Sequence, residues 1–147
     1  MAPGDKELIL KDLCARLPYG VKLQKTNDAS DSVEIYLVDL GHDIIKFYTY
    51  KGEGLTMCDV GNIERFGKLR YKPYLFPLSS MTDEQRQEYT YIVNYISPDD
   101  TDNWKEGEFI YVEQFTQLMH FYHKNHLDYR GLITMGLATD ATGLNIY

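Results

Sequence analysis

The sequence contains little cysteine and no long apolar run. Cys14 and Cys58 are the only cysteines among 147 residues, and they form no C-x-x-C pair. This spacing predicts neither a disulfide framework nor a cysteine-based zinc site. No stretch approaches the roughly 18 apolar residues of a membrane helix, and the first residues, MAPGDKELILKDL, are charged where a signal peptide has an apolar segment. We therefore expect a cytoplasmic protein without membrane association.

Basic residues are in the minority. The chain has 15 Lys and Arg against 22 Asp and Glu, which gives a formal net charge of −7. Nonspecific binding to nucleic acid depends on Lys and Arg that neutralise phosphates, so the charge disfavours a nucleic-acid partner. Two roles stay open: an ordinary acidic protein, or one whose carboxylates address a basic protein partner.

Motifs of catalysis are also missing. The glycines match no phosphate-binding spacing. Ser79 and Ser80 stand before a predicted helix without a G-x-S-x-G elbow, and Cys58 and His42 are a pair by composition alone. We assign no catalytic residue and expect no cofactor.

Aromatic residues are abundant, above all tyrosine. The chain has thirteen tyrosines, six phenylalanines and one tryptophan. Tyrosine combines a large flat ring with a hydroxyl group that needs a hydrogen-bond partner, which suits half-buried sheet faces or an extended binding surface. A nucleic-acid binder that stacks bases on tyrosines is therefore an alternative, although the charge argues against it.

The periodicity of apolar residues changes along the first half of the chain. Residues 5–17 have the spacing of an amphipathic helix that ends before Pro18. Its expected core positions are Leu10, Leu13, Cys14 and Leu17. From residue 19 to about residue 59 the period is two, which is typical of strands. The expected strands are 19–24, 32–40, 43–50 and 55–60, and turn-forming clusters occupy 26–31, 41–43 and 51–54.

The second half of the chain has helical patterns. Pro73 and Pro77 argue against a central strand before it. Thr82 and Gln85 form a T-x-x-Q capping box, which predicts a helix from there to about residue 96. A second helix is expected at 112–124, and its apolar stripe would consist of Val112, Phe115, Met119 and Tyr122.

The end of the chain completes the expected architecture. Asn125 is placed to cap the second helix in a left-handed conformation, a short helix would start near Leu132, and the apolar end TGLNIY should dock on the body. The fold class is α+β, with an N-terminal helix, an antiparallel meander or small barrel-like sheet of three to five short strands, two main helices and a short C-terminal helix. One domain would span residues 1–147, with strands at about 19–76 and helices at about 82–147.

Three histidines lie near the end of the second predicted helix. His120 and His123 are three residues apart and could contact one ion, with His126 as a third ligand. A zinc site needs such a third ligand, and no H-E-x-x-H motif is present. The negative end of the helix dipole gives a sufficient reason for cationic side chains here. We favour the helix-end interpretation and keep a small metal-dependent hydrolase, centred on the three histidines, as the alternative.

Two polar segments are candidates for binding. In HLDYRG, Asp128 could bridge His126 and Arg130, either to fix a turn or as a polar anchor on an interface; we favour the turn. In SPDDTDNWKEGE, three aspartates stand close to a tryptophan. This segment is either a solvated connector or a steering patch beside an aromatic anchor. The residues concerned are Asp99, Asp100, Asp102 and Trp104.

Three stretches carry a family resemblance: KDLCARLPYGVK, KPYLFPLSSMT and NHLDYRGLITMGLATDATGLNIY. They resemble a family of small hypothetical proteins encoded by phages, prophages and other mobile elements of Bacteroides. The resemblance implies a bacterial host cytoplasm and supplies no catalytic residues. Only His126 of the three histidines lies in a matching stretch.

The sequence thus favours a non-enzymatic accessory protein of a phage or mobile element that acts by binding another protein. An acidic inhibitor of a host defence protein is one form that this function could take. The metal-dependent hydrolase and the tyrosine-rich nucleic-acid binder are the alternatives.

Overall fold

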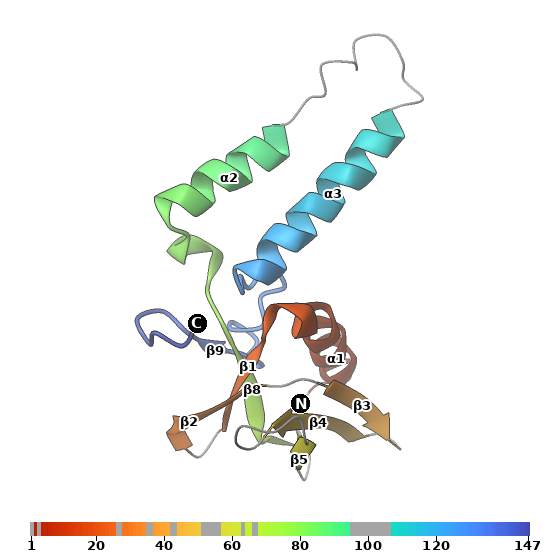
Figure 1. Cartoon of the computed structure of the whole chain (residues 1–147), viewed down its shortest axis with the longest axis vertical. Helices are drawn as coiled ribbons and strands as arrows, with labels where there is room; N and C mark the ends of the chain where they lie inside the picture. The colour runs from red at the N-terminus through yellow and green to blue at the C-terminus, as the bar shows by residue number, and fades with distance from the viewer. Residues whose placement is uncertain are drawn as a thin grey trace.

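The structure is a computed structural model in which 2, 4–25, 28–34, 37–41, 44–50, 57–62, 64–65, 68–94 and 107–147 are described (Figure 1). Side chains are described for 2, 4–25, 69–94 and 112–147. The fold is α+β and begins with a helix, as predicted. The helices are α1 (Asp5–Arg16), α2 (Asp83–Asn94) and α3 (Gly107–Lys124), with 3-10 turns η1 (Leu17–Tyr19) and η2 (Leu78–Ser80). The strands are β1 (Lys22–Lys25), β2 (Asp28–Glu34), β3 (Leu37–Gly41), β4 (Ile44–Tyr50), β5 (Met57–Asn62), β6 (Glu64–Arg65), β7 (Lys68–Leu69), β8 (Tyr71–Leu75) and β9 (Thr139–Asp140).

The strands form more than one sheet, which corrects the prediction of a single meander or barrel. One sheet has the order β2-β1-β8-β9, a second is the antiparallel meander β3-β4-β5, and β6 pairs with β7. Residues 32–40, expected as one strand, are divided between β2 and β3 in different sheets, and part of the expected turn at 26–31 belongs to β2. Pairing with β1 places the polar segment DASDSVE in a strand, because cross-strand contacts outweigh local preference.

Pro73 lies inside a central strand, and the prediction against this is wrong. It is opposite Leu23 in the pairing of β8 with β1, and β9 pairs with β8 on the other side. The β9 ladder starts at Tyr74, one residue after the proline. A proline fits in a central strand at a position where an N–H group would have no partner in the ladder. Because the short β9 pairs with β8 only from Tyr74 onward, Pro73 occupies such a position.

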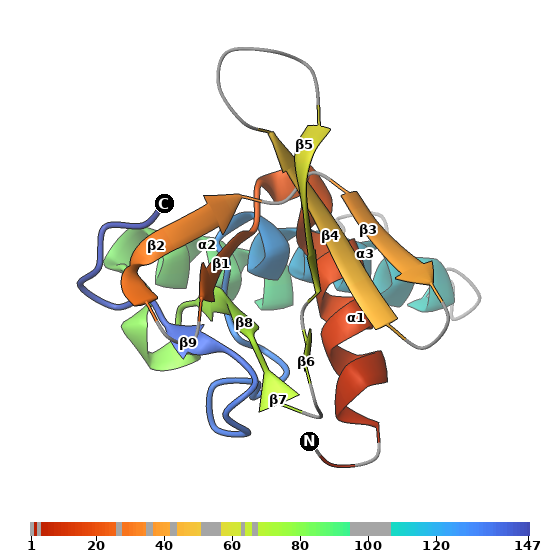
Figure 2. The same ribbon diagram turned by 90° about the horizontal axis from the view of Figure 1, so that it is seen from below.

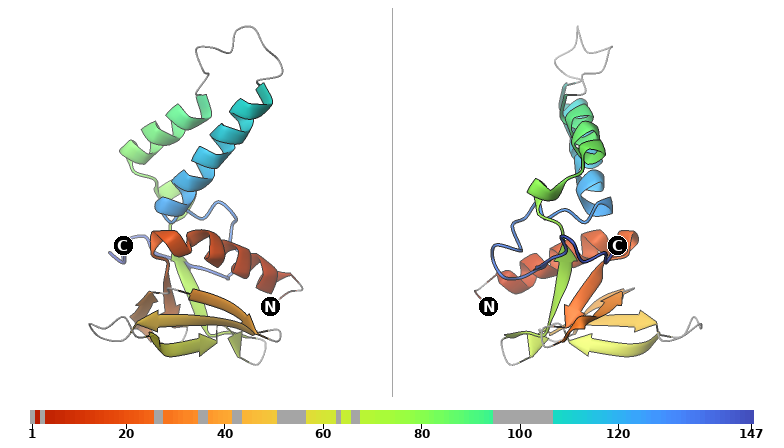
Figure 3. Two further views of the ribbon diagram at one scale, coloured as in Figure 1. Left: turned by 45° about the vertical axis from the view of Figure 1, so that its right-hand side comes forward. Right: turned by 90° about the vertical axis from the view of Figure 1, so that its left-hand side faces the viewer.

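The two main helices project from the body as a hairpin. In Figures 1 and 3, α2 and α3 lie side by side in one layer, and α1 lies between this hairpin and the β3-β4-β5 sheet. Figure 2 shows the same sheet from below, next to α1. The capping box that starts α2 is confirmed: the Thr82 N–H donates to Gln85 Oε1 at 2.9 Å, and the Gln85 N–H donates to Thr82 Oγ1 at 3.2 Å.

The buried face of α1 differs from the predicted one. Cys14 is exposed, while two charged residues are fully buried. The buried positions keep the helical spacing i, i+3, i+4 and i+7, but the sequence stripe was centred one residue too late. They are Ile9, Asp12, Leu13 and Arg16.

The expected apolar stripe of α3 is buried only at the C-terminal end of the helix. Val112 is 64% exposed and Phe115 is 61% exposed, whereas Phe121 and Tyr122 are buried. The C-terminal turns of α3 pack on the body, while its N-terminal part lies in the projecting hairpin, where α2 covers a single side (Figure 1). The amphipathic pattern therefore identifies the apolar face of α3 correctly. In the N-terminal part of the helix, however, no described element buries that face.

The segment after α3 has no helix among the described residues, so the prediction of one near Leu132 is wrong. Residues 131–136 form turns bounded by Gly131 and Gly136, with φ of 74° and 73°. These left-handed residues interrupt a helix and turn the chain into β9, which pairs parallel to β8. Docking of the chain end is confirmed, because the Tyr147 hydroxyl donates to the Tyr74 carbonyl at 2.9 Å and accepts from the Lys22 N–H at 3.0 Å.

Candidate functional site

The C-terminal end of α3 closes in a left-handed residue, which is His126 (φ 52°) and not Asn125 as expected. The Leu127 N–H donates to the Tyr122 carbonyl at 2.9 Å, and the His126 N–H donates to the His123 carbonyl at 3.1 Å. This pair of bonds is a Schellman motif, usually closed by glycine. Histidine is among the few side chains that enter this conformation with some frequency.

The three histidines have separate partners. His120 Nδ1 is hydrogen-bonded to the Tyr19 hydroxyl at 2.7 Å, and His123 Nε2 to the Tyr129 hydroxyl at 2.9 Å. The ring of His126 stacks on Tyr147 with centroids 3.6 Å apart. Among the described residues, no three His, Cys, Asp or Glu side chains are placed to hold a metal ion. The arrangement gives the metal-dependent hydrolase no support.

The last turn of α3 contains His123 and Lys124, as the helix-end interpretation expects, and Lys124 supplies cationic charge there. Burial lowers the pKa of His126 to about 4 and also lowers the pKa of His123 below its usual 6.5. Burial thus disfavours the cationic form of both rings. Arg16 of α1 adds a further cation at this helix end, since its guanidinium donates to the carbonyl of Tyr122, in the last turn of α3, at 3.4 Å and to that of Leu127, beyond the helix, at 2.7 Å.

Arg16 belongs to a buried ion pair that the sequence analysis missed. Its Nε donates to Asp12 Oδ2 at 2.8 Å and its Nη2 to Asp12 Oδ1 at 3.1 Å, and both side chains are fully buried. A fully buried pair needs this bidentate geometry and further acceptors to offset its desolvation. The sequence contained a signal for this pair, because Asp12 and Arg16 carry opposite charges four residues apart, beside the core position Leu13 of an amphipathic helix. The pair fixes the foot of the hairpin to α1.

The predicted corner of His126, Asp128 and Arg130 does not form. Asp128 is buried, and its two carboxylate oxygens accept the N–H groups of Leu132 at 2.8 Å and Ile133 at 2.9 Å. Arg130 turns the other way, with its Nε 3.3 Å from Asp12 Oδ1 and its guanidinium over the ring of Tyr129. The N–H groups of Leu132 and Ile133 lie within hydrogen-bond reach of the Asp128 carboxylate, so they stabilise its charge in place of Arg130. The turn-fixing role that we favoured therefore belongs to Asp128 alone.

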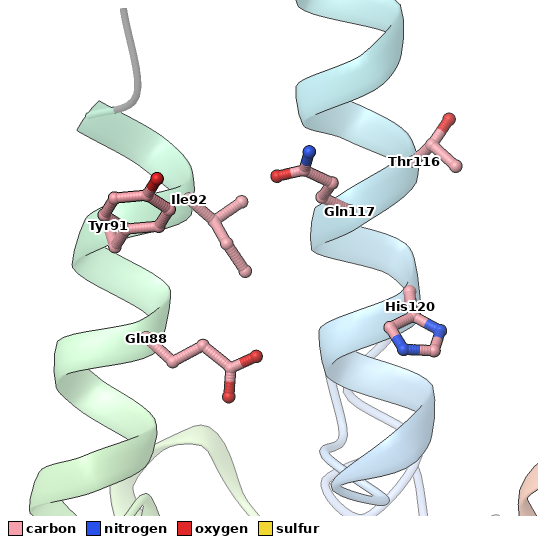
Figure 4. A pocket seen from close by; sticks show the side chains of 6 residues that line it. All are labelled: Glu88, Tyr91, Ile92, Thr116, Gln117 and His120. Carbon is pink, nitrogen blue, oxygen red and sulfur yellow. The ribbon is translucent and has the colours of Figure 1, made fainter.

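A groove runs between the helices of the hairpin. It has a volume of about 450 Å³. Glu88 and Ile92 extend from α2 toward α3, and Gln117 extends from α3 toward α2 (Figure 4). The lining residues are Glu88, Tyr91, Ile92, Thr116, Gln117 and His120. This groove is our candidate functional site.

The hairpin carries four of the eight large apolar side chains that are exposed among the described residues. Tyr91, beside the groove, is 66% exposed, and Val112 and Phe115 on α3 are exposed to a similar extent. Val93, on the last turn of α2, is 37% exposed. Exposed apolar residues are ordinary when they are scattered, but a group of them on one projecting element is typical of an interaction surface.

The other residues proposed for binding lie elsewhere or outside the description. The candidates Asp99, Asp100, Asp102 and Trp104 fall outside the described residues, in the segment that joins α2 to α3 in the sequence. His42 also falls outside them, and the side chain of Cys58 is not described. Of the histidines, His120 alone lines the groove, while His126, Asp128 and Arg130 lie at the foot of the hairpin. The groove itself was not predicted, because it depends on how two helices distant in sequence pack.

Comparison with known proteins found no matching family model, no matching curated protein and no matching solved structure. No helix within the described ranges combines the length and apolar character needed to cross a membrane. The candidate site is therefore argued from its own geometry.

Proposed function

We propose that this chain is a non-enzymatic interaction protein that binds another protein through the α2–α3 hairpin. The observation that carries the proposal is the exposure of Tyr91, Val112 and Phe115 on an element that projects from the body (Figure 3). Burying such side chains against a partner removes apolar surface from water and stabilises a complex. Tyrosine is also enriched among the residues that dominate binding energy.

The construction of the foot of the hairpin supports this role. Arg16, paired with Asp12, donates to the Tyr122 carbonyl in the last turn of α3 and to the Leu127 carbonyl beyond it, and the Phe76 N–H donates to the His126 carbonyl at 2.9 Å. The hairpin is thereby fixed to both α1 and the end of β8. A binding surface on a fixed element loses less conformational entropy when a partner docks.

The biological context belongs to the same proposal and is supported by sequence alone. We propose that the protein serves a phage or mobile element in the cytoplasm of a bacterial host, as its resemblance suggests. An inhibitor of a host nucleic-acid-binding defence protein is one form consistent with the net charge of −7. Such a target has a basic surface, and complementary charge speeds its encounter with an acidic protein.

Site-specific photocrosslinking in host cells tests the proposed function. Tyr91 or Phe115 is replaced by a photoreactive phenylalanine, and the same replacement at Leu144 is the control. Leu144 is apolar and 50% exposed, but it follows β9 and lies outside the hairpin. We expect a discrete crosslinked protein from the two hairpin positions and none from Leu144. Crosslinks from Leu144 alone, or equal products from all three positions, would exclude the hairpin as the binding surface.

A further inference from the structure

The groove face of the hairpin has a defined set of residues. On α2, Glu84, Glu88 and Tyr91 are spaced at i, i+4 and i+7, so they lie on one side of the helix. On α3, Glu113, Gln117 and His120 share the side that faces the groove by the same spacing. Phe115 is two residues from Gln117, which corresponds to about 200° around the helix, and therefore lies on a different face.

The groove combines an apolar strip with acidic edges. Ile92 lies between the helices at the floor of the groove and is only 6% exposed, whereas the ring of Tyr91, which borders the groove, is 66% exposed and supplies most of the apolar surface. Glu88 forms an ion pair with Lys124, so the charge of this lysine is already matched. Glu84 is exposed at the start of α2, and Glu113 is exposed on α3, where its Oε1 accepts a hydrogen bond from Gln117 Nε2 at 3.3 Å. Among the described side chains of this face, these two carboxylates leave an excess of negative charge.

The walls of the groove restrict what can occupy it. Both walls are α-helices whose backbone N–H and C=O groups are bonded within each helix, so an extended segment would find no strand edge to pair with. A helical segment satisfies its own backbone groups and presents only side chains to the groove. The shorter wall has 12 residues, about 18 Å of helix, which an ordinary helix can follow along its length.

We propose that the groove binds a basic amphipathic helix of a partner protein, which packs its apolar face on Ile92 and Tyr91 and places Lys or Arg beside Glu84 and Glu113. This inference rests on the proposed function and names the partner of the same site. A second copy of the chain fits less well, because each copy carries −7 and the pairing would bring like charges together. Phosphate groups of a nucleic acid would be repelled by the same carboxylates.

Three synthetic peptides of about 18 residues, long enough to form a helix, provide the probe. The first has a leucine stripe flanked by lysines, the second has the same stripe flanked by glutamates, and the third is a scramble of the first that has no stripe. Binding to the full chain is measured by fluorescence anisotropy. We expect the basic amphipathic peptide to bind at least about tenfold more tightly than either of the others. Its affinity should fall when salt is raised from about 50 mM to about 500 mM.

Matched variants locate the binding. Gln117→Arg places a cation in the groove and should weaken binding of the basic peptide by about tenfold or more. Leu144→Arg adds the same charge to a side chain that is 50% exposed and lies after β9, outside the hairpin, and it should change affinity by less than about twofold. Glu84→Gln combined with Glu113→Gln should flatten the salt dependence. Circular dichroism of each variant checks that the hairpin is folded.

Several outcomes overturn this inference. They are no detectable binding of the basic peptide, equal binding of its scramble, or equal weakening by Gln117→Arg and Leu144→Arg. A dimer of the unliganded chain that Gln117→Arg dissociates would assign the groove to a second copy. If photocrosslinking from Tyr91 or Phe115 still captures a protein, the proposed function stands while the inference about the basic helix fails.

Discussion

At the scale of single residues, His126 joins three parts of the fold. Its backbone closes α3, its carbonyl accepts from Phe76, and its ring stacks on Tyr147 at the end of the chain. Its Nδ1 atom is buried without a hydrogen-bond partner. Arg16 and Lys22 add positive charge nearby, which together with burial disfavours the imidazolium form and lowers the pKa of His126 to about 4.

We predict that His126 makes the fold sensitive to acid. The unfolded chain protonates this histidine near pH 6.5, whereas the folded chain does so near pH 4, so the unfolded state binds more protons between these values. The free energy of unfolding is therefore unaffected by this group above pH 6.5 and falls as the pH is lowered from 6.5 to 4. The loss attributable to His126 should be about 3 kcal/mol.

Urea unfolding at several pH values, compared between the parent and His126→Asn, measures this effect. Asparagine accepts the left-handed conformation and does not titrate in this range. Carboxylates contribute equally to both proteins, so the difference in pH slope reports His126. Identical slopes from pH 6.5 to 4 would show that the ring titrates in the same way when folded and unfolded.

At the scale of elements, Asp128 shapes the segment that a helix was expected to occupy. Its carboxylate accepts the N–H groups of Leu132 and Ile133, which begin the turns bounded by Gly131 and Gly136. Leu132 is fully buried, and Leu137 and Ala138 beyond the turns reach the same core cluster. The carboxylate therefore sets the path of the chain from α3 to β9.

We predict that Asp128→Ala lowers the free energy of unfolding by about 2–4 kcal/mol, because two buried or half-buried backbone donors lose their acceptor. Asp128→Asn retains one side-chain acceptor and should lose about half as much. Thermal or urea unfolding gives both values. A loss as large in Arg130→Ala as in Asp128→Ala would point back to the corner proposed from the sequence, where the two side chains pair.

At the scale of the whole molecule, the fold consists of two packed clusters joined through buried charge. One cluster contains α1, β1 and β8, and the other contains the foot of the hairpin around Phe121 and Leu127. Arg16, on α1, donates to the Leu127 carbonyl in the second cluster. Asp12 forms ion pairs with both Arg16 and Arg130. The orientation of the hairpin, and hence of the groove, depends on this connection.

We predict that Asp12→Ala destabilises the protein by about 3–5 kcal/mol, because it leaves the Arg16 guanidinium buried without its counter-ion. Glu7 and Lys11 form an ion pair with the same i, i+4 spacing on the same helix, but both side chains are more than half exposed. Lys11→Ala is therefore the matched control and should leave the unfolding midpoint nearly unchanged. Equal effects of Asp12→Ala and Lys11→Ala in urea unfolding would refute a structural role for the buried pair.

The features that could be predicted correctly from the sequence depend on groups a few residues apart. The capping box of Thr82 and Gln85, the start of α1 at Asp5 and the strand pattern of β4 are of this kind. Their hydrogen bonds or side-chain periodicity are local, so the pattern of residues contains the physical cause. Docking of the chain end was also predicted; it is made through the Tyr147 hydroxyl, while Leu144 stays 50% exposed.

Which apolar or charged faces become buried depends on contacts between residues far apart in the sequence. The stripe of α3 has one apolar character throughout, yet Tyr122 is buried and Phe115 is exposed, because the body ends partway along the helix. Asp12 and Arg16 occupy a core face because acceptors from residues more than a hundred positions away complete their hydrogen bonds. Likewise, the groove exists because α2 and α3 lie side by side, a packing that local sequence patterns do not specify.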